Sequence, residues 1–292
     1  MPAKLDTMRK LMPLLLLFPW AAAVFGQPVA ATALAPAQVQ AMVERALASE
    51  ARATQDTSRP MRFRLRRSSP RLTSTKEIIE TREGDVARLV AINDQPLSPA
   101  DEQREEARLD ALLSDAGRQG RLRAREQSDI GIVLKLLRIL PQAFTYEYAG
   151  TGQSSSGSVE KFRFRPNPAF SPPDLETQAL TAMIGEVWID AASERVARLE
   201  GHLQQDANYG WGILGKLDKG GWIVIEQADV GAGQWRITRC QMKMDLRILF
   251  KSRSFDTAQE MSQYAPIPNG LSYRQAIHML RAAAGSSAQG GR

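Results

Sequence analysis

The sequence has few of the residues from which disulfides and metal sites are built. Its 292 residues include one cysteine, Cys240, and two histidines, His202 and His278. A single cysteine excludes an intramolecular disulfide, and it lies too far from the N-terminus to be a lipid-attachment site. These three side chains are far apart in the sequence and provide no ligand set with the spacing of a zinc or iron site. We therefore expect no metal and no other cofactor.

Catalytic motifs are also missing. Nucleophilic catalysis needs a base beside a serine or cysteine, and the chain has no G-x-S-x-G motif. The segment Gly210–Lys216 matches a dinucleotide-binding fingerprint and most of a P-loop. However, Leu217 replaces the Ser/Thr that would bind magnesium, and the residues after Gly215 cannot begin a stable helix. Asp190 and Glu226 are candidates for acid–base chemistry, but nothing distinguishes them from turn and surface residues, so we expect a protein that is not an enzyme.

Long apolar runs are missing too, except at the N-terminus. The stretch Leu11–Val24 follows three basic residues, contains two prolines and is shorter than the roughly 20 residues of a membrane-spanning helix. Small residues follow it, which is typical of a secretory signal peptide over residues 1–26, cut before Gln27. An uncleaved membrane anchor is the alternative. We expect a soluble mature protein outside the cytosol, in peripheral contact with membranes at most.

The positive charge is modest in total and concentrated in one segment. The whole chain carries +6, and six arginines lie between Arg59 and Arg71. A secreted location and a single nearby aromatic residue, Phe63, argue against a nucleic-acid partner. Anionic lipid or lipopolysaccharide head groups fit such a patch better. The alternative is a solvated strand face with Phe63 and Leu65 buried beneath it.

Most of the chain shows the periodicity of β-strands. Residues 27–36 are rich in alanine and proline and predict a flexible leader, and apolar residues at helical spacing then predict an amphipathic helix over residues 37–53. Alternating segments separated by turn residues follow. The predicted strands cover residues 61–67, 72–82, 86–92, 144–148, 161–165, 185–190, 195–205, 222–229 and 235–251.

Helices interrupt this pattern in an insertion at about residues 98–140. Ser98 can cap a charged helix that runs to about Ala116. An arginine-rich connector covers Gly117–Glu126, and a further helix runs from Ser128 to Leu140, where Pro141 stops it.

The remaining elements complete one domain. A short helix is expected over residues 175–183 and a last helix over residues 272–284, before a disordered tail over residues 285–292. Antiparallel strands with grouped helices make residues 37–284 a single α+β domain.

The stretch Trp235–Lys251 shows the clearest alternation in the chain. Every second residue is apolar and its neighbours are polar, which places one face of a long strand in an interior and the other in water. The apolar set is Cys240, Met242, Met244, Leu246, Ile248 and Phe250. Because methionine adapts to irregular apolar shapes, this face either lines a hollow that accepts an apolar ligand or belongs to an ordinary core.

One hairpin resembles a known family. The strand Gly185–Asp190 ends in Trp-Ile-Asp, and the returning strand Arg195–Glu200 ends in Arg-Leu-Glu. This hairpin is similar to one in the periplasmic lipoprotein-sorting (LolA/LolB-type) family, and the order of elements over residues 37–251 is similar in outline. The charged insertion and the proline-rich residues 167–173 depart from the family pattern. The resemblance implies a curved antiparallel sheet, an incomplete barrel, with helices packed on or in its concave face.

The resemblance and the alternation together predict a function. We expect a periplasmic binding protein that holds lipid acyl chains, or a lipoprotein or other envelope component, against the concave face. The residues expected to line the hollow are Phe162, Phe164, Met242, Met244, Leu246, Ile248 and Phe250. Arg62, Arg64 and Arg66 are expected to meet head groups at its rim. The alternative is an envelope structural or adaptor protein with a filled core, whose helical insertion binds a protein partner.

Overall fold

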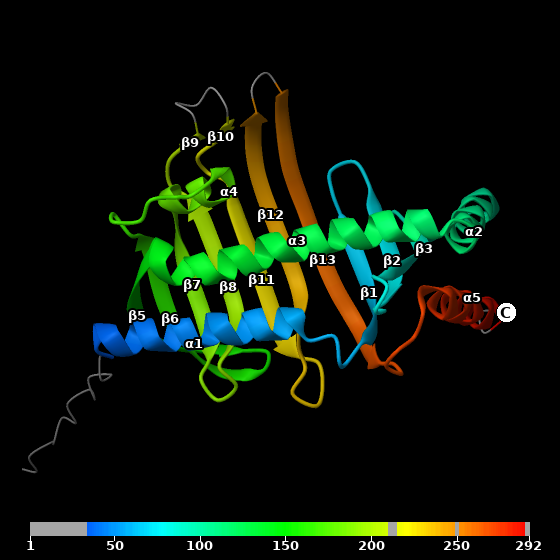
Figure 1. The fold of residues 1–292 in the computed structure, drawn as a ribbon, viewed down its shortest axis with the longest axis horizontal. Helices are drawn as coiled ribbons and strands as arrows, with labels where there is room; N and C mark the ends of the chain where they lie inside the picture. The colour runs from blue at the N-terminus through cyan, green and yellow to red at the C-terminus, as the bar shows by residue number, and fades with distance from the viewer. Residues whose placement is uncertain (1–33, 210–214, 249–250, 290–292) are drawn as a thin grey trace, which may run out of the picture. The chain divides into compact units, whose positions relative to one another are not determined.

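The structure, a computed structural model, describes residues 34–209, 215–248 and 251–289, which belong to one compact unit (Figure 1). The predicted signal peptide, most of the predicted leader and Phe250 lie outside these residues. Among the described helices, none combines the length and the apolar character that crossing a membrane requires.

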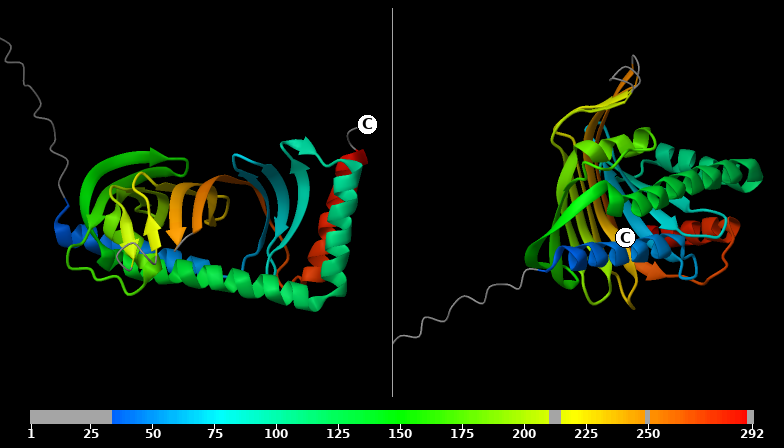
Figure 2. Two further views of the ribbon diagram at one scale, coloured as in Figure 1. Left: turned by 90° about the horizontal axis from the view of Figure 1, so that it is seen from above. Right: turned by 60° about the vertical axis from the view of Figure 1, so that its left-hand side comes forward.

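The strands form one antiparallel sheet that does not close. Their order is β4-β3-β2-β1-β13-β12-β11-β8-β7-β6-β5, and the short β9 and β10 lie beside β12. The fold is therefore the predicted α+β class, a curved antiparallel sheet with helices on its concave face (Figures 1 and 2). The strands are β1 (Met61–Ser68), β2 (Thr73–Ile79), β3 (Val86–Ile92), β4 (Gln95–Pro96), β5 (Phe144–Ser154), β6 (Gly157–Pro166), β7 (Met183–Asp190), β8 (Arg195–Leu203), β9 (Ala207–Tyr209), β10 (Gly215–Leu217), β11 (Trp222–Asp229), β12 (Trp235–Ile248) and β13 (Lys251–Pro266).

Two helices, α1 (Pro36–Gln55) and α3 (Ala116–Ala143), cross the concave face of the sheet (Figure 1). Proline is tolerated at the start of α1 because the first turn of a helix has no use for its missing N–H. The buried stripe of α1 is Val39, Val43, Ala46, Leu47 and Glu50. Its four apolar members pack against Phe162, Val187 and Ile189 and form the core over β6 and β7.

A second core lies on the opposite face, at the other end of the sheet. There α2 (Pro99–Ser114) and α5 (Tyr273–Gln289) cover β2 and β3. The buried side chains are Ile79, Val86, Leu109, Leu112, Tyr273, Ala276, Ile277 and Leu280. Ile79 pairs with Arg62 of β1, so this face is the one that carries the β1 arginines. The two cores have no residue in common.

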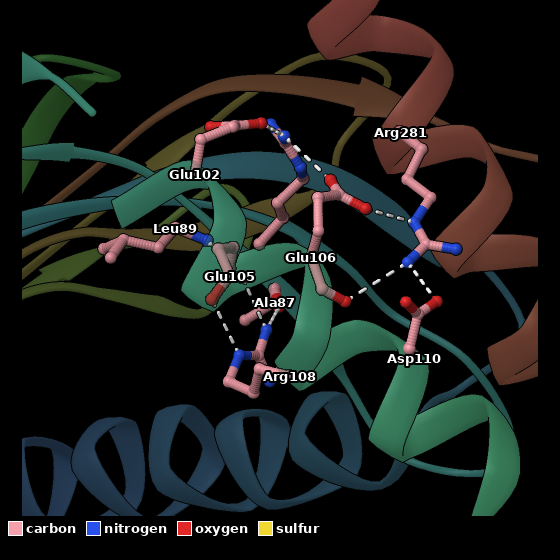
Figure 3. Close-up of polar contacts among 9 residues, drawn as sticks. Ala87, Leu89, Glu102, Glu105, Glu106, Arg108, Asp110 and Arg281 are labelled. Atoms are coloured by element: carbon pink, nitrogen blue, oxygen red, sulfur yellow. Dashed lines mark hydrogen bonds and ion pairs between the residues drawn. The ribbon is translucent and has the colours of Figure 1, made fainter. Parts of the chain in front are cut away.

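Helix α2 also binds the outer edge of β3 (Figure 3). The backbone N–H of Leu89 donates to the buried carboxylate of Glu105 over 2.8 Å, and Arg108 donates to the carbonyl oxygen of Ala87. Arg108 also binds Glu105, so the two side chains form a pair along the strand. Such contacts occupy backbone groups that an open sheet edge would otherwise offer to another strand.

Helix α3 is longer than the sequence predicts. It runs unbroken through the predicted connector and past Pro141. The connector is rich in Arg, Gln, Leu, Ala and Glu, which are good helix formers. The carboxylate of Asp115 caps the helix by accepting hydrogen bonds from the N–H groups of Gly117 and Arg118. Pro141 lies in the last turn, and the helix ends two residues later, at Ala143.

The prediction for the last part of the chain was wrong in one important respect. It placed a single strand over residues 235–251, whereas β12 ends at Ile248 and a second long strand, β13, follows. Positions such as Thr257 and Gln259 give β13 no regular apolar alternation, so no periodic signal marks it. Nevertheless β13 joins β1 to β12 and thereby connects the two parts of the sheet. Helix α5 continues to Gln289 and so includes residues that the sequence assigned to the tail.

Candidate functional site

The concave face is packed where α1 and the C-terminal part of α3 cover strands β5 to β8. Phe162 is fully buried against α1, and Phe164 is 5% exposed in a cluster with Ala143, Phe144 and Leu180. Both phenylalanines were predicted to line a hollow. The structure places them in filled core instead, where they stabilise the fold by burying apolar surface.

The concave face is more open over β11, β12, β13 and β1. Met242, Met244 and Leu246 are half-buried on β12, and Ile248 is 43% exposed. These four residues share one face, as the alternation predicts. They lie toward the end of the strand, whereas the cavities on this face lie nearer its beginning, where Trp235 and Ile237 are found.

A cavity of about 250 Å³ lies between the beginning of β12 and the end of α1. Its walls on the sheet include the apolar and aromatic side chains of Phe63, Trp235, Ile237, Met261 and Tyr264 together with the polar side chains of Glu80, Arg195, Gln227 and Arg236, while Ala53 and Thr54 face them from α1. The rings of Phe63 and Tyr264 stack with their centroids 5.1 Å apart. We call this space the apolar cavity.

A second cavity, of about 370 Å³, adjoins the first and shares Ala53, Thr54, Glu80 and Arg236 with it. Four carboxylates line it, those of Asp56, Glu80, Asp85 and Glu126. Glu126 reaches down from α3 and accepts a hydrogen bond from the backbone N–H of Asp85 over 3.0 Å. A guanidinium nitrogen of Arg236 lies 3.7 Å from a carboxylate oxygen of Glu80. We call this space the acidic cavity.

The crowding of carboxylates alters their protonation. Burial raises the pKa of Glu80 above its usual range, although the charge of Arg236 opposes this. The pKa of Asp85 is raised to about 8, first by desolvation and then by the negative charges of Glu126 and Glu80. Protonation of Asp85 lowers the repulsion between α3 and the sheet.

Glu50 of α1 forms the polar end of the apolar cavity. Its carboxylate is buried and accepts hydrogen bonds from Arg195 at 2.8 and 2.9 Å, from the N–H of Val196 at 2.8 Å and from Gln227 at 3.1 Å. These bonds connect α1 to β8 and β11, so they hold the helix in place over the sheet.

The predicted position of Arg62, Arg64 and Arg66 at the rim of the hollow is wrong. Register places their side chains on the convex face, because Phe63, between the first two, faces α1. Their charges are also matched. Arg62 and Arg64 bind Glu77 at 2.6 and 2.9 Å, and Arg66 binds Asp94 at 2.7 Å.

Few reactive side chains lie near the cavities. Cys240 is half-buried, and burial raises the pKa of its thiol. His202 lies on the convex face and contacts Glu200 over 2.8 Å. Within the described ranges, no group of three or more His, Cys, Asp or Glu side chains has the arrangement of a metal site.

The sequence contained a signal for Glu50 but not for the cavity walls. Glu50 follows Val43 and Leu47 at helical spacing, so it continues the apolar stripe of α1, and a carboxylate at such a position requires a buried partner. Met261 and Tyr264 belong to β13, which the sequence did not reveal. Their pairing with β1 brings together walls that are far apart in the chain.

The fold and cavities define a class of architecture, an open curved sheet with helices across its concave face. No protein-family model matches the chain, and no curated protein matches it. Among solved structures, the chain is similar to a crystal structure from Vibrio parahaemolyticus, described as a domain of an outer membrane lipoprotein-sorting protein. The two are 10% identical, the match covers 80% of this chain and 98% of that chain, and the TM-score is 0.29. The resemblance is remote, and values this low transfer no ligand or activity.

Proposed function

We propose that this protein is a non-enzymatic binding protein of the periplasm that holds an apolar chain in the apolar cavity. This ligand would be a lipid acyl chain or the acylated part of an envelope component. The observation that carries the proposal is the half-exposure of Phe63, Met261 and Tyr264 on a sheet face that two helices cross. Elsewhere on the same face equivalent side chains are buried.

The size and shape of the cavity fit a chain better than a bulky ligand. Small-molecule sites span roughly 300–1,000 Å³, so a cavity of about 250 Å³ is small. A single flexible hydrocarbon chain can follow a narrow space between a helix and a sheet. The adjoining acidic cavity, with Arg236 at the boundary, offers polar groups to the head group of such a ligand.

Fluorescence titration with cis-parinaric acid tests the proposal, because this fatty acid emits more strongly in apolar surroundings. Met261→Glu places a carboxylate in the cavity wall, and Ile237→Trp fills the space with a larger side chain. We expect each change to weaken binding by about tenfold or more, which corresponds to 1.4 kcal/mol.

Met279→Glu provides the matched control. Met279 is 37% exposed on α5, away from the cavity, so the same substitution there should leave the titration unchanged. Thermal melts would show that all three variants fold. Equal affinities for wild type, Met261→Glu and Ile237→Trp would refute the proposed site.

The adaptor alternative has one observation in its favour. Leu122, Ile132 and Val133 of α3 are 47%, 39% and 45% exposed. Leu122 and Val133 are eleven residues apart and so lie on nearly the same side of the helix. If α3 binds a protein partner, the wild-type protein should capture that partner from envelope extracts in a pull-down. Leu122→Ser should abolish this capture without changing fatty-acid binding.

A further inference from the structure

The end of the sheet at which β12 and β13 turn carries unmatched positive charge. Its exposed cations are Arg67, Arg71, Lys243, Arg247, Lys251 and Arg253. Within the described residues none of the six forms an ion pair, whereas most arginines elsewhere on the sheet do. Asp245 and Asp256 lie among them, and Asp245 accepts a hydrogen bond from Ser254. Asp206 and Asp218 lie at the same end and are paired with Lys216. This end of the sheet is therefore positively charged.

The hairpin also extends beyond its neighbours. Pairing of β11 with β12 ends at Trp222 and Lys243, and pairing of β1 with β13 ends at Ser68 and Ala258. Past these points the two strands continue together, with only the short β10 beside β12. Figure 1 shows the pair, with β9 and β10 nearby, extending past the other strands of the sheet.

Apolar side chains are exposed at the same end. Ile248 on the hairpin is 43% exposed, and Leu72 in the neighbouring β1–β2 turn is 49% exposed. A cation is next to each, because Lys251 pairs with Ile248 across the hairpin and Arg71 precedes Leu72. An exposed apolar residue flanked by unmatched cations suits the boundary of an anionic bilayer, where the cations meet lipid head groups and the apolar side chain enters the acyl region.

The opposite end of the sheet lacks this character. Its turns carry the carboxylates of Asp190, Glu194 and Asp229. Of its cations, Arg45 is paired with Glu194 and Arg59 with Asp56, while Arg82 in the β2–β3 turn forms no ion pair among the described residues but lies in the same turn as Glu83 and Asp85. The charge of the sheet is thus polarised along its strands, and an anionic surface would attract one end only.

We propose that the β12–β13 end of the sheet, with Arg247, Lys251 and Ile248 at its centre, docks on the surface of an anionic lipid bilayer. This surface is independent of ligand binding in the apolar cavity. It includes Arg67 and Arg71 of the arginine-rich segment but not Arg62, Arg64 and Arg66, which are paired with carboxylates on the convex face.

Co-sedimentation with vesicles tests the proposal. Wild-type protein should sediment with vesicles of phosphatidylcholine that contain phosphatidylglycerol, and much less with phosphatidylcholine alone. Arg247→Glu/Lys251→Glu should weaken binding to the anionic vesicles by about 25-fold or more, since each cation near such a surface contributes about fivefold (about 1 kcal/mol). Ile248→Ser should weaken it in high salt, where the electrostatic attraction is screened.

Arg45→Glu/Arg59→Glu is the matched control, because it reverses the same number of charges at the opposite end. It should sediment as the wild type does. Thermal melts and cis-parinaric acid titration without vesicles should be unchanged in the hairpin variants, which separates this surface from the cavity. The proposal is overturned if wild-type protein does not prefer anionic vesicles, or if the hairpin variant binds as well as the control. If Ile248→Ser binds anionic vesicles in high salt as well as the wild type does, Ile248 does not insert into the bilayer.

Discussion

Individual side chains hold the helices over the sheet, and Glu50 is the most important of them. Its buried carboxylate accepts hydrogen bonds from Arg195, Val196 and Gln227. Removing it leaves a buried guanidinium and a buried N–H without their acceptor. A charge separated from its partner in a low-dielectric site costs far more than the pair itself contributes.

Glu50→Ala should therefore lower the free energy of unfolding by about 3–5 kcal/mol. Chemical denaturation followed by circular dichroism measures this. Glu44, exposed on the same helix, provides the control, and Glu44→Ala should change stability by less than about 0.5 kcal/mol. If both variants unfold at the same denaturant concentration, Glu50 does not anchor α1.

The acidic cavity makes stability depend on pH. Because the pKa of Asp85 rises from its ordinary value of 3.8 to about 8 on folding, the folded state binds a proton that the unfolded state has lost. The free energy of unfolding then falls as pH rises from about 4 to about 8. Above this range the ionised carboxylate repels Glu126 and Glu80.

Asp85→Asn should remove part of this dependence. We expect the variant to be more stable than wild type at pH 9 and to differ less from it at pH 4, as measured by denaturation across that range. Asp129→Asn on the exposed face of α3 should keep the wild-type profile. A steeper profile in Asp85→Asn would contradict the raised pKa.

At the scale of single elements, prediction from sequence succeeded where the side-chain pattern was regular. The strands Val86–Ile92 and Trp222–Asp229 begin and end as predicted, because turn residues flank each alternating run. It failed for β13, whose helix-side positions are partly polar, and for α3. β13 pairs with the distant β1 as well as with β12, and α3 packs against the distant α1. Met261 and Tyr264 of β13 line the apolar cavity, and Glu126 and Ile130 of α3 line the acidic cavity, so neither cavity could be located from the sequence.

Helix α2 has a role that is visible only at this scale, the protection of a sheet edge. Glu105 and Arg108 occupy backbone groups of Leu89 and Ala87 on β3 (Figure 3). Without them β3 would present free groups to another copy of the chain. The other outer strand, β5, pairs only with β6 along its length.

Glu105→Ala should both destabilise the protein and promote self-association. The N–H of Leu89 would lose its acceptor, at a cost of about 1–3 kcal/mol. Arg104→Ala, on the exposed side of α2, is the control. Size-exclusion chromatography with light scattering over a concentration series measures association. A strictly monomeric Glu105→Ala protein would show that the edge needs no such protection.

At the scale of the whole described unit, the sheet is continuous but its apolar core is not. One set of clusters lies under α1 and α3 over β5 to β8, and another lies beneath α2 and α5 over β2 and β3. Between them, the concave face of β11, β12, β13 and β1 is half-exposed and contains the apolar cavity. The regular repeat of strands in the sequence predicts one sheet, but it carries no information on which helix covers which strands.

This division predicts that the two ends of the sheet can lose structure separately. Leu109 is fully buried in the α2–α5 core and Leu47 is 5% exposed in the α1 core. Changing either to alanine should lower the free energy of unfolding by about 2–5 kcal/mol.

The expected result is local if the sheet between the cores transmits little of this loss of stability. Amide hydrogen exchange in Leu109→Ala should then accelerate mainly in β2, β3, α2 and α5, and in Leu47→Ala mainly in α1 and β6 to β8. Mass spectrometry of peptides after exchange distinguishes the two patterns. Equal acceleration throughout both variants would mean that the hydrogen bonds of β11 to β1 make the unit fully cooperative. A ligand in the apolar cavity would then stabilise the whole unit, not only the strands that line it.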